Sequence, residues 1–442
     1  MASKGQLLRV LGVGFGVAVS LGSTVGAGIL RTPGMVAAEL RSEPLIIVSW
    51  LFGGLCALLF TICVCELATM LPYEGGWYVY ARRAFGGYGG FFAGYSDWLV
   101  QVVALSYVGV VAGDLIATLL PAFSLGVKAN SILILGLLGL LHYMGIRIGS
   151  RAQKLNSLIV GLGLIGFVVA CFVSGHRDVV SSAPSTLALP PTGLPLLAAL
   201  VIAFQSIIVT YDGWYGAIYF MEEDRDPTRN LPRSAIGGVA CSIAIFLLVN
   251  VALLHVLPLQ QLAASAVPAS DVSQIIFGKA GQKIILLISL LTVLGVTNAT
   301  LLIAPRILFA LGRDGWFFRR AAEANKGGTP VTGLFLSVLV ASALILTRSF
   351  EKLMAIQSVL VVVLYLTGFT SLFVLRKREP DLPRHFRVWG YPWTPLVALV
   401  GSLVYLGLNL ASDFKNGILA LAFVGLSYPA FLVASRLKAR EQ

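Results

Sequence analysis

Two short runs of small and polar residues interrupt apolar stretches of this sequence, and they are the first candidates for chemistry. The first is Ser23-Thr24-Val25-Gly26-Ala27-Gly28 with Ile29 after it, and the second is Val209-Thr210-Tyr211-Asp212-Gly213-Trp214. Hydroxyls and glycines together favour a break in a helix, where irregular backbone exposes N–H and C=O groups to a polar gap. The two runs therefore predict a binding site built largely from backbone.

Asp212 is the most informative ionisable residue, because a carboxylate inside an apolar stretch is costly and usually functional. It could contact a cationic solute, or it could accept hydrogen bonds from the unwound backbone around it. The second interpretation is favoured. Tyr211, Trp214 and Tyr215 could stack on a solute or form a gate, but aromatic side chains in such stretches more often pack, and packing is favoured for Tyr215.

Four other polar residues in apolar stretches are candidates for ion coupling. Asp97 could belong to a proton relay. Thr297 or Thr300, together with carbonyls of the first run, could bind a hard cation such as Na⁺, which prefers oxygen ligands. Hydrogen bonding between helices is the favoured alternative for Thr297, Asn298 and Thr300.

Long apolar helices must position these residues. Of the 442 residues, 57% are hydrophobic and only 12% are charged, against about 25% charged in soluble domains. A bilayer core needs about 20 apolar residues per helix, so the sequence predicts an all-α polytopic membrane protein with about twelve transmembrane helices. The expected spans are 10–38, 45–70, 88–119, 131–144, 153–174, 194–222, 234–256, 284–311, 331–346, 354–375, 393–411 and 417–435.

The net charge of +12 comes from cations in short loops on one side of the expected spans, so it requires no nucleic-acid partner. The positive-inside rule then places both termini in the cytoplasm of a cell whose plasma or inner membrane holds the protein. The opposite side keeps only Arg41, Lys128, Arg177, Lys279, Lys283, Arg348, Lys352 and Lys415. The five cysteines fall within apolar runs and show neither a disulfide framework nor zinc spacing.

The two interrupted stretches are the first and sixth spans, five spans apart. Interrupted helices in corresponding positions of two halves indicate an inverted-repeat transporter with its site at the breaks. Close packing of helices is the alternative for Gly12, Gly14 and Gly16, whereas unwinding is favoured for 23–28.

The sequence resembles the amino acid, polyamine and organocation (APC) transporter superfamily, and within it the L-type amino-acid exchanger branch, over nearly the full chain. The matching pieces are Gly26-Ala27-Gly28-Ile29 with Pro33, Glu66-Leu67 through Pro72, Gly75-Gly76, Tyr78-Val79-Tyr80, Thr210-Tyr211-Asp212-Gly213-Trp214, Glu222-Glu223, Asn230-Leu231-Pro232, and Arg376 to Pro380 with Arg384, Phe386-Arg387, Gly390-Tyr391-Pro392-Trp393 and Pro395. Their order and spacing together are highly specific.

The resemblance implies a LeuT-like 5+5 fold with spans one and six unwound at mid-membrane. The repeats would cover 10–174 and 194–376, with two peripheral spans in 390–436. It also implies that the substrate is an amino acid. The N–H groups of Gly26, Ala27 and Gly28 are expected to bind its carboxylate, and carbonyls of Val209, Thr210 and Tyr211 its ammonium group.

Three departures from the family pattern bear on mechanism. Val209 stands where relatives commonly place an aromatic gate, which predicts a weaker gate or one built elsewhere. Val160 stands where L-type relatives place a lysine thought to replace a sodium ion, so coupling to Na⁺ or H⁺ stays open. The loop 120–130 has no cysteine, so no disulfide-linked heavy subunit is expected.

Other classes fit less well. No repeated filter signature indicates a channel, and the four histidines are scattered singly, so no enzymatic activity and no cofactor are expected. A secondary active transporter of L-amino acids, an exchanger or an ion-coupled permease, is the favoured function. A non-transporting amino-acid sensor and a transporter of a related amine or polyamine on the same fold stay open.

Overall fold

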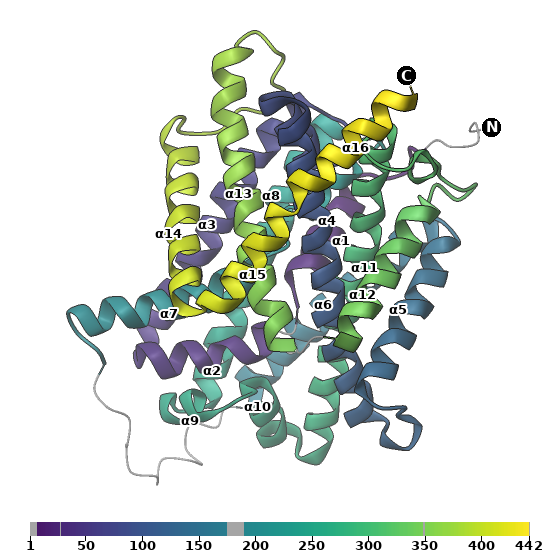
Figure 1. Cartoon of the computed structure of the whole chain (residues 1–442). Helices are drawn as coiled ribbons and strands as arrows, with labels where there is room; N and C mark the ends of the chain where they lie inside the picture. Colours follow the sequence, from purple (N-terminus) through teal and green to yellow (C-terminus); the bar gives the residue numbers. More distant parts are fainter. Residues whose placement is uncertain (1–6, 27, 175–189, 348–349, 442) are drawn as a thin grey trace.

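The computed structural model describes residues 7–26, 28–174, 190–347 and 350–441. These residues form a bundle of helices and one isolated β-bridge between Leu11 and Asp224 (Figure 1). The expected all-α architecture is confirmed.

Nine stretches of the described residues are long and apolar enough to cross a bilayer, one bent helix pair is a tenth, and two shorter apolar helices complete the set. This agrees with the twelve spans expected. In order they are α1 (Val13–Thr24) with α2 (Gly28–Leu40), α3 (Glu43–Met70), α4 (Trp77–Leu119), α5 (Val127–Tyr143), α6 (Ile146–Ser174), α7 (Leu194–Tyr211) with η3 (Gly216–Phe220), α8 (Pro227–Val256), α11 (Lys279–Arg313), α12 (Val331–Thr347), α13 (Phe350–Arg378), α14 (Trp393–Ser412), and α15 (Phe414–Gly425) with α16 (Ser427–Glu441).

The outer surface of the bundle is apolar, as a lipid environment requires. On α5, Leu133, Leu137 and Leu140 are 51%, 58% and 66% exposed, at the i, i+4, i+7 spacing of one helix face. Asn130 and Ser131 on the same helix are buried. This inverts the pattern of a soluble bundle, because polar groups avoid hydrocarbon.

The structure departs from the expected boundaries most clearly in two places. The third span begins at Trp77 rather than 88, since α4 continues through a kink at Gly86, whose φ is +82°. Two short helices, α9 (Leu259–Ala264) and α10 (Pro268–Phe277), occupy the connection after α8. Their brevity keeps them below the length that a scan for membrane spans detects.

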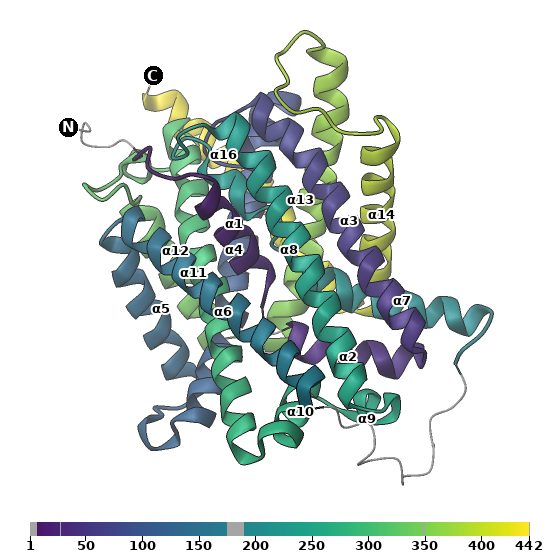
Figure 2. The same cartoon turned by 180° about the vertical axis from the view of Figure 1, so that it is seen from behind.

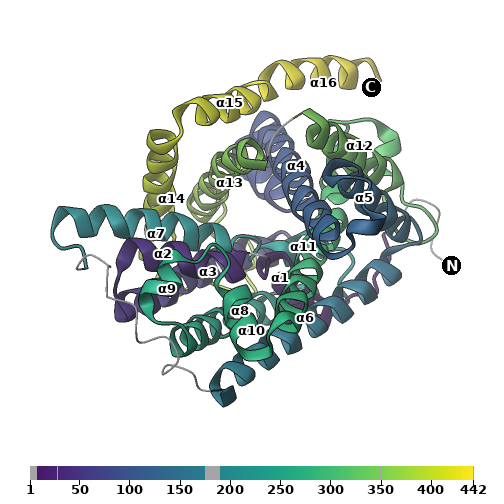
Figure 3. The same ribbon diagram turned by 90° about the horizontal axis from the view of Figure 1, so that it is seen from below.

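The last two spans lie at the edge of the bundle, where α14, α15 and α16 wrap its outside (Figure 3). The long helices α4 and α11 run through the middle and pack against each other. Helix α1 lies near the centre of the bundle (Figure 3), where it packs against α6, α8 and α11, so the first break is in the interior.

The first and last described residues, 7 and 441, lie at one end of the molecule, the terminal end, as the two opposite views in Figures 1 and 2 show. Basic side chains gather there in ion pairs and hydrogen bonds. Arg82 pairs with Asp314, and Lys438 Nζ donates to the Asp314 carbonyl at 2.6 Å. The short helices α9 and α10 lie at the opposite end (Figure 1).

Candidate functional site

The first break separates α1 from α2, whose axes are bent by 46°. Helix α1 ends with the Val25 N–H donating to the Leu21 carbonyl at 2.7 Å, and the Gly26 N–H turns back to the Thr24 carbonyl at 2.9 Å. Helix α2 then begins at Gly28, so its free N–H groups and positive dipole end face the break. Ala27 lies outside the described residues.

The second break follows α7. Asp212 has an extended backbone (φ −59°, ψ 151°), and Gly213 has φ +99° before the short η3 segment begins. A Cβ atom at Gly213 would overlap the Ser23 carbonyl. Gly213 is therefore required both by its left-handed backbone and by the close approach of the first break.

The two breaks are in contact. Ser23 Oγ donates to the Gly213 carbonyl at 2.7 Å and shares its proton with the Val19 carbonyl at 2.6 Å. Nearby, the hydroxyls of Thr32 and Thr210 lie 2.9 Å apart, and a Cβ atom at Gly28 would contact Thr210 at 3.2 Å. The sequence marked Ser23 as part of a break but gave no sign of its partner 190 residues away.

Asp212 is braced from α13. The Tyr365 hydroxyl donates to Asp212 Oδ1, and Trp214 Nε1 donates to that hydroxyl at 3.1 Å. The carboxylate is thus an acceptor, but its donor is a side chain of another helix, so acceptance from the unwound backbone itself stays a prediction. Sequence reasoning missed Tyr365, which stands in a plain apolar span.

The aromatic side chains in and next to the second run point in different directions. Trp214 is 2% exposed and packs with Trp77 and Tyr365, with ring centroids 6.2 and 5.5 Å away. Tyr215 packs against the same pair, as favoured from the sequence. Tyr211 points away, its hydroxyl donating to the Trp50 carbonyl at 3.2 Å. Only the Tyr211 backbone is thus available to a solute.

Val209 and Ile29 are placed differently. The Val209 side chain is 40% exposed, on the same face of α7 as Ile202, and its carbonyl accepts from the Asp212 N–H at 3.3 Å. Ile29 is fully buried in the first turn of α2. Val25 is also buried, at 4% exposure.

The side chains of the candidate coupling residues on α11 form hydrogen bonds to protein groups. Thr297 and Thr300 donate to the carbonyls of Val293 and Val296, each at 2.9 Å and within α11 itself. Asn298 reaches across to α6, where its amide donates to Gln153 Oε1 at 2.6 Å. The interhelical bond expected as the alternative is therefore present for Asn298.

A small cavity of about 20 Å³ adjoins the first break, which is room for about one water molecule. Its walls are Leu21, Gly22, Val25, Asn156, Ser157, Val160, Gly161, Ile245 and Thr292. Around it, neutral donors of α6 hold the neighbouring helices: Ser157 Oγ donates to the Ala18 carbonyl at 2.8 Å, and Asn156 Nδ2 to the Leu291 carbonyl at 3.1 Å. Thr292, rather than Thr297 or Thr300, faces this space.

Asp97 forms hydrogen bonds to the second half of the broken sixth span. It is fully buried on α4 and accepts the Tyr219 hydroxyl at 2.8 and 2.9 Å and the Gln101 amide at 3.2 Å. Tyr219 belongs to η3, so Asp97 links that segment to the long helix α4.

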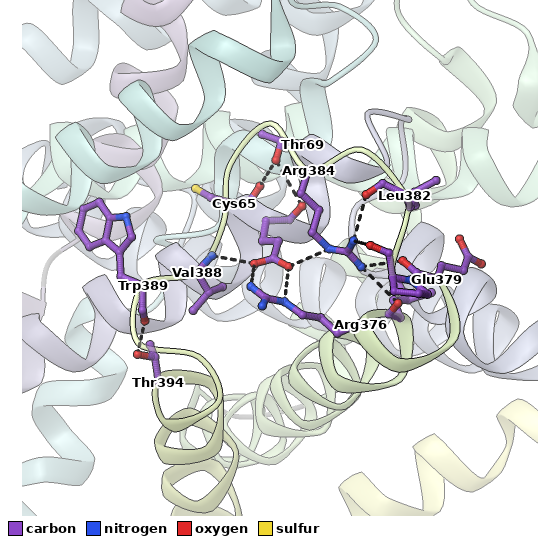
Figure 4. Close-up of polar contacts among 12 residues, drawn as sticks. Cys65, Thr69, Arg376, Glu379, Leu382, Arg384, Val388, Trp389 and Thr394 are labelled. Carbon is purple, nitrogen blue, oxygen red and sulfur yellow. Dashed lines mark hydrogen bonds and ion pairs between the residues drawn. The ribbon is translucent and has the colours of Figure 1, made fainter.

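A second buried carboxylate pairs with basic residues at the end of α13 and in the loop after it (Figure 4). Glu66 of α3 accepts from Arg376 Nε at 2.7 Å and from the Val388 N–H at 2.7 Å, and lies 3.2 Å from Arg384 Nε. Arg384 also donates to four backbone carbonyls between 375 and 382. This motif anchors the loop 379–392 to α3, away from both breaks.

Twelve spans with two broken helices that meet in the interior define a membrane transporter. The sequence model of the amino acid permease family matches residues 10–424. The chain therefore belongs to the amino acid permease family of the APC superfamily, and it is a multi-pass amino acid transporter.

Characterised proteins of similar sequence cover most of the chain. The serine/threonine exchanger SteT of Bacillus subtilis (strain 168) is 25% identical over 98% of this chain and 98% of its own length. The b(0,+)-type amino acid transporter 1 of Mus musculus is 24% identical, over 90% and 82% of the two chains. The large neutral amino acids transporter small subunit 2 of Homo sapiens is 26% identical, over 86% and 72%.

Proposed function

We propose that this transporter exchanges small or mid-sized neutral L-amino acids by alternating access, at a site between the two breaks. The contact of Ser23 with Gly213 carries this proposal, because it brings both interrupted helices to one point. The similarity to a serine/threonine exchanger agrees with a small neutral substrate. The two halves 10–174 and 194–376 act as inverted repeats in this account, with 390–436 peripheral.

The site holds the two ends of an amino acid by opposite backbone poles. The N–H of Gly28, at the start of α2, binds the carboxylate together with the N–H groups of Gly26 and Ala27. The Gly26 N–H, which donates to the Thr24 carbonyl in this structure, exchanges that bond for one to the substrate. Carbonyls at the end of α7, those of Thr210 and Tyr211 foremost, accept from the ammonium group. Because Asp212 is held by Tyr365, no free carboxylate is offered to a cationic side chain, which favours neutral substrates.

The residues around Val160 support exchange that does not require Na⁺. The neutral donors of Asn156 and Ser157 bond α1 and α11 there, so no cation is needed to join those helices. Thr297, Asn298, Thr300 and Asp97 are structural in this account.

The protein functions in the cell membrane with the terminal end in the cytoplasm. The basic residues collected at that end support this orientation, as with Arg82 and Lys438 around Asp314. The loop 120–130 contains no cysteine, so the transporter acts without a disulfide-linked heavy subunit.

Amino acid binding to purified Gly26→Leu protein tests the site. A leucine side chain fills the first break, and binding should fall below detection while the protein stays folded. Gly14→Leu is the matched control on α1, since nothing lies within 4 Å of the position a Cβ atom would take there. Unchanged binding by Gly26→Leu would remove the assignment.

A further inference from the structure

Two buried carboxyl groups share one buried arginine at the terminal end. Glu74, between α3 and α4, and Glu223, just after η3, are 0% exposed, and Arg306 of α11 is 1% exposed. Neither carboxyl group belongs to the substrate site described above. Buried charges of this kind persist only where they are paired or have a function.

The arginine is shared unequally. Arg306 Nε and Nη2 donate to the two oxygens of Glu223 at 2.5 and 3.0 Å, a bidentate pair. Glu74 Oε1 lies 3.3 Å from the same Nε, but it makes no hydrogen bond although it is buried. Glu74 is thus a second carboxyl group beside a guanidinium group that already forms a bidentate ion pair with Glu223.

The local charge does not balance if every carboxyl group is ionised. Glu74, Glu222 and Glu223 face Arg306 and Arg313, with Glu222 pairing with Arg313 at the rim. Three carboxylates against two guanidinium groups leave one negative charge, and arginine cannot lose its proton to compensate. One bound proton would restore neutrality.

The geometry locates that proton between Glu74 and Glu223. Burial, and then the negative charge of Glu223, raise the pKa of Glu74 well above its ordinary value, against the effect of Arg306. Burial also raises the pKa of Glu223, while the charge of Arg306 and its hydrogen bonds to the carboxylate lower it. A neutral Glu74 can donate to Glu223, which gives its unpaired oxygen a partner.

The shared arginine bridges parts of the protein that must separate for this end to open. The N–H groups of Val10 and Leu11 donate to the Glu223 carbonyl at 3.0 and 2.9 Å, so the start of span one and the end of span six are joined. Arg306 belongs to the continuous helix α11. In alternating access the broken helices move against such a helix, which would pull Glu223 off Arg306.

We propose that Glu74 and Glu223 form a proton-binding site, which holds one proton while the terminal end is closed and releases it to the cytoplasm when Glu223 leaves Arg306. This proposal rests on the alternating-access function proposed above. On opening, Glu74 ionises and replaces Glu223 as the partner of Arg306, so the guanidinium is paired in both conformations.

Several other titratable groups face the cluster. They are Arg313 of α11, Glu222 after η3, Tyr80 of α4 beside Glu74, and His142 of α5 beside Arg306. Arg306 itself stacks 4.8 Å from the Phe220 ring. Glu74 and Glu223 are the pair among them that shares one guanidinium while buried.

Infrared difference spectroscopy of the full-length protein tests the site without relying on transport. At neutral pH, Glu74→Gln is expected to lose one protonated-carboxyl C=O stretching band relative to the unmodified protein. Glu223→Gln should lose the same band, because the remaining Glu74 then ionises against Arg306. A band unchanged in both variants would overturn the proposal, and retention in either one would show that the pair does not share a proton.

Glu379→Gln is the matched control. Its carboxylate pairs with Arg83 at the surface, where the two side chains are 25% and 54% exposed, so the band should persist. If Glu74→Gln does not fold, Glu223→Gln carries the test alone. Loss of the band in Glu379→Gln as well would show a general effect of the substitution and contradict the assignment.

Exchange in liposomes supplies the functional arm. The closed form holds the proton and the open form does not, so raising pH favours opening and lowering pH favours the closed form. Exchange should therefore slow severalfold from alkaline to acidic pH in the unmodified protein, and Glu74→Gln should flatten this dependence. The same slope in both proteins would contradict the proposal. A protein that shows the infrared band but no exchange would instead contradict the proposed function.

Discussion

At the scale of single residues, the site depends on side chains and glycines that let two breaks approach each other. Ser23 and Gly213 make the direct contact, and Tyr365 holds the carboxylate next to it. None of these is a catalytic group. Their task is to keep irregular backbone in one shape, so that its N–H and C=O groups are ready for a substrate.

Gly213→Ala is expected to damage both folding and binding. A Cβ atom would overlap the Ser23 carbonyl at a backbone φ of +99°, and the left-handed conformation alone costs about 1–2 kcal/mol for an L-residue. Thermal unfolding in detergent and amino acid binding measure the two effects. Gly14→Ala should change neither, and a fully active Gly213→Ala protein would contradict the described contact.

Tyr365→Phe tests the brace on Asp212. The substitution removes one hydroxyl that donates to Asp212 and accepts from Trp214, and hydrogen bonds to charged groups contribute about 1.5–3 kcal/mol. We expect lower thermal stability and weaker amino acid binding. Combination with Asp212→Asn should add little further loss, because both variants break one interaction. Fully additive losses would mean that Asp212 acts independently of Tyr365.

The sequence predicted the positions of both breaks but not the residues that join them. Glycines clustered with hydroxyls within an apolar span indicate irregular backbone, so Gly26, Gly28 and Gly213 were identifiable. Tyr365 and the partner of Ser23 were not, because a long-range contact leaves no periodic trace in either segment. Val209 and Tyr211 were expected to offer their carbonyls to the ammonium group, which stays a prediction. Their side chains lie elsewhere, since that of Val209 is exposed and that of Tyr211 points to α3.

At the scale of elements, the length of each apolar stretch determines where a transmembrane helix forms. The connecting segments determine which helices are held against one another. The twelve spans were predictable because about 20 apolar residues have one stable form in a bilayer. The helices α9 and α10 were not, since short amphipathic segments carry a weak signal. The loop 379–392 depends on Glu66, which is distant in sequence.

Glu66→Gln is expected to loosen that loop and destabilise the protein. The substitution leaves Arg376 and Arg384 without their buried partner, and breaking a buried ion pair costs about 3–5 kcal/mol. Thermal unfolding and limited proteolysis of the loop 379–392 would report the effect.

Glu379→Gln offers the comparison, because an exposed ion pair contributes only about 0–1 kcal/mol. The anchoring role of Glu66 is disproved if both variants unfold at the same temperature and the loop resists protease equally in both.

At the scale of the whole molecule, the distribution of charge fixes how the protein sits in the membrane. In a background without native cysteines, Leu125→Cys lies in the loop opposite the terminal end, and Glu323→Cys lies at the terminal end. A membrane-impermeant maleimide added to intact cells should label only Leu125→Cys. Labelling of Glu323→Cys from outside would reverse the orientation and place the proton-binding site on the external face.

The central claim, exchange of neutral amino acids by alternating access, is tested most directly in liposomes containing the purified protein. Uptake of labelled serine or threonine should be much faster into vesicles preloaded with a neutral amino acid than into empty ones, with or without Na⁺. Uptake that needs Na⁺ and ignores the preloaded substrate would contradict exchange. Binding of the same amino acids without any uptake would contradict transport itself and identify a sensor.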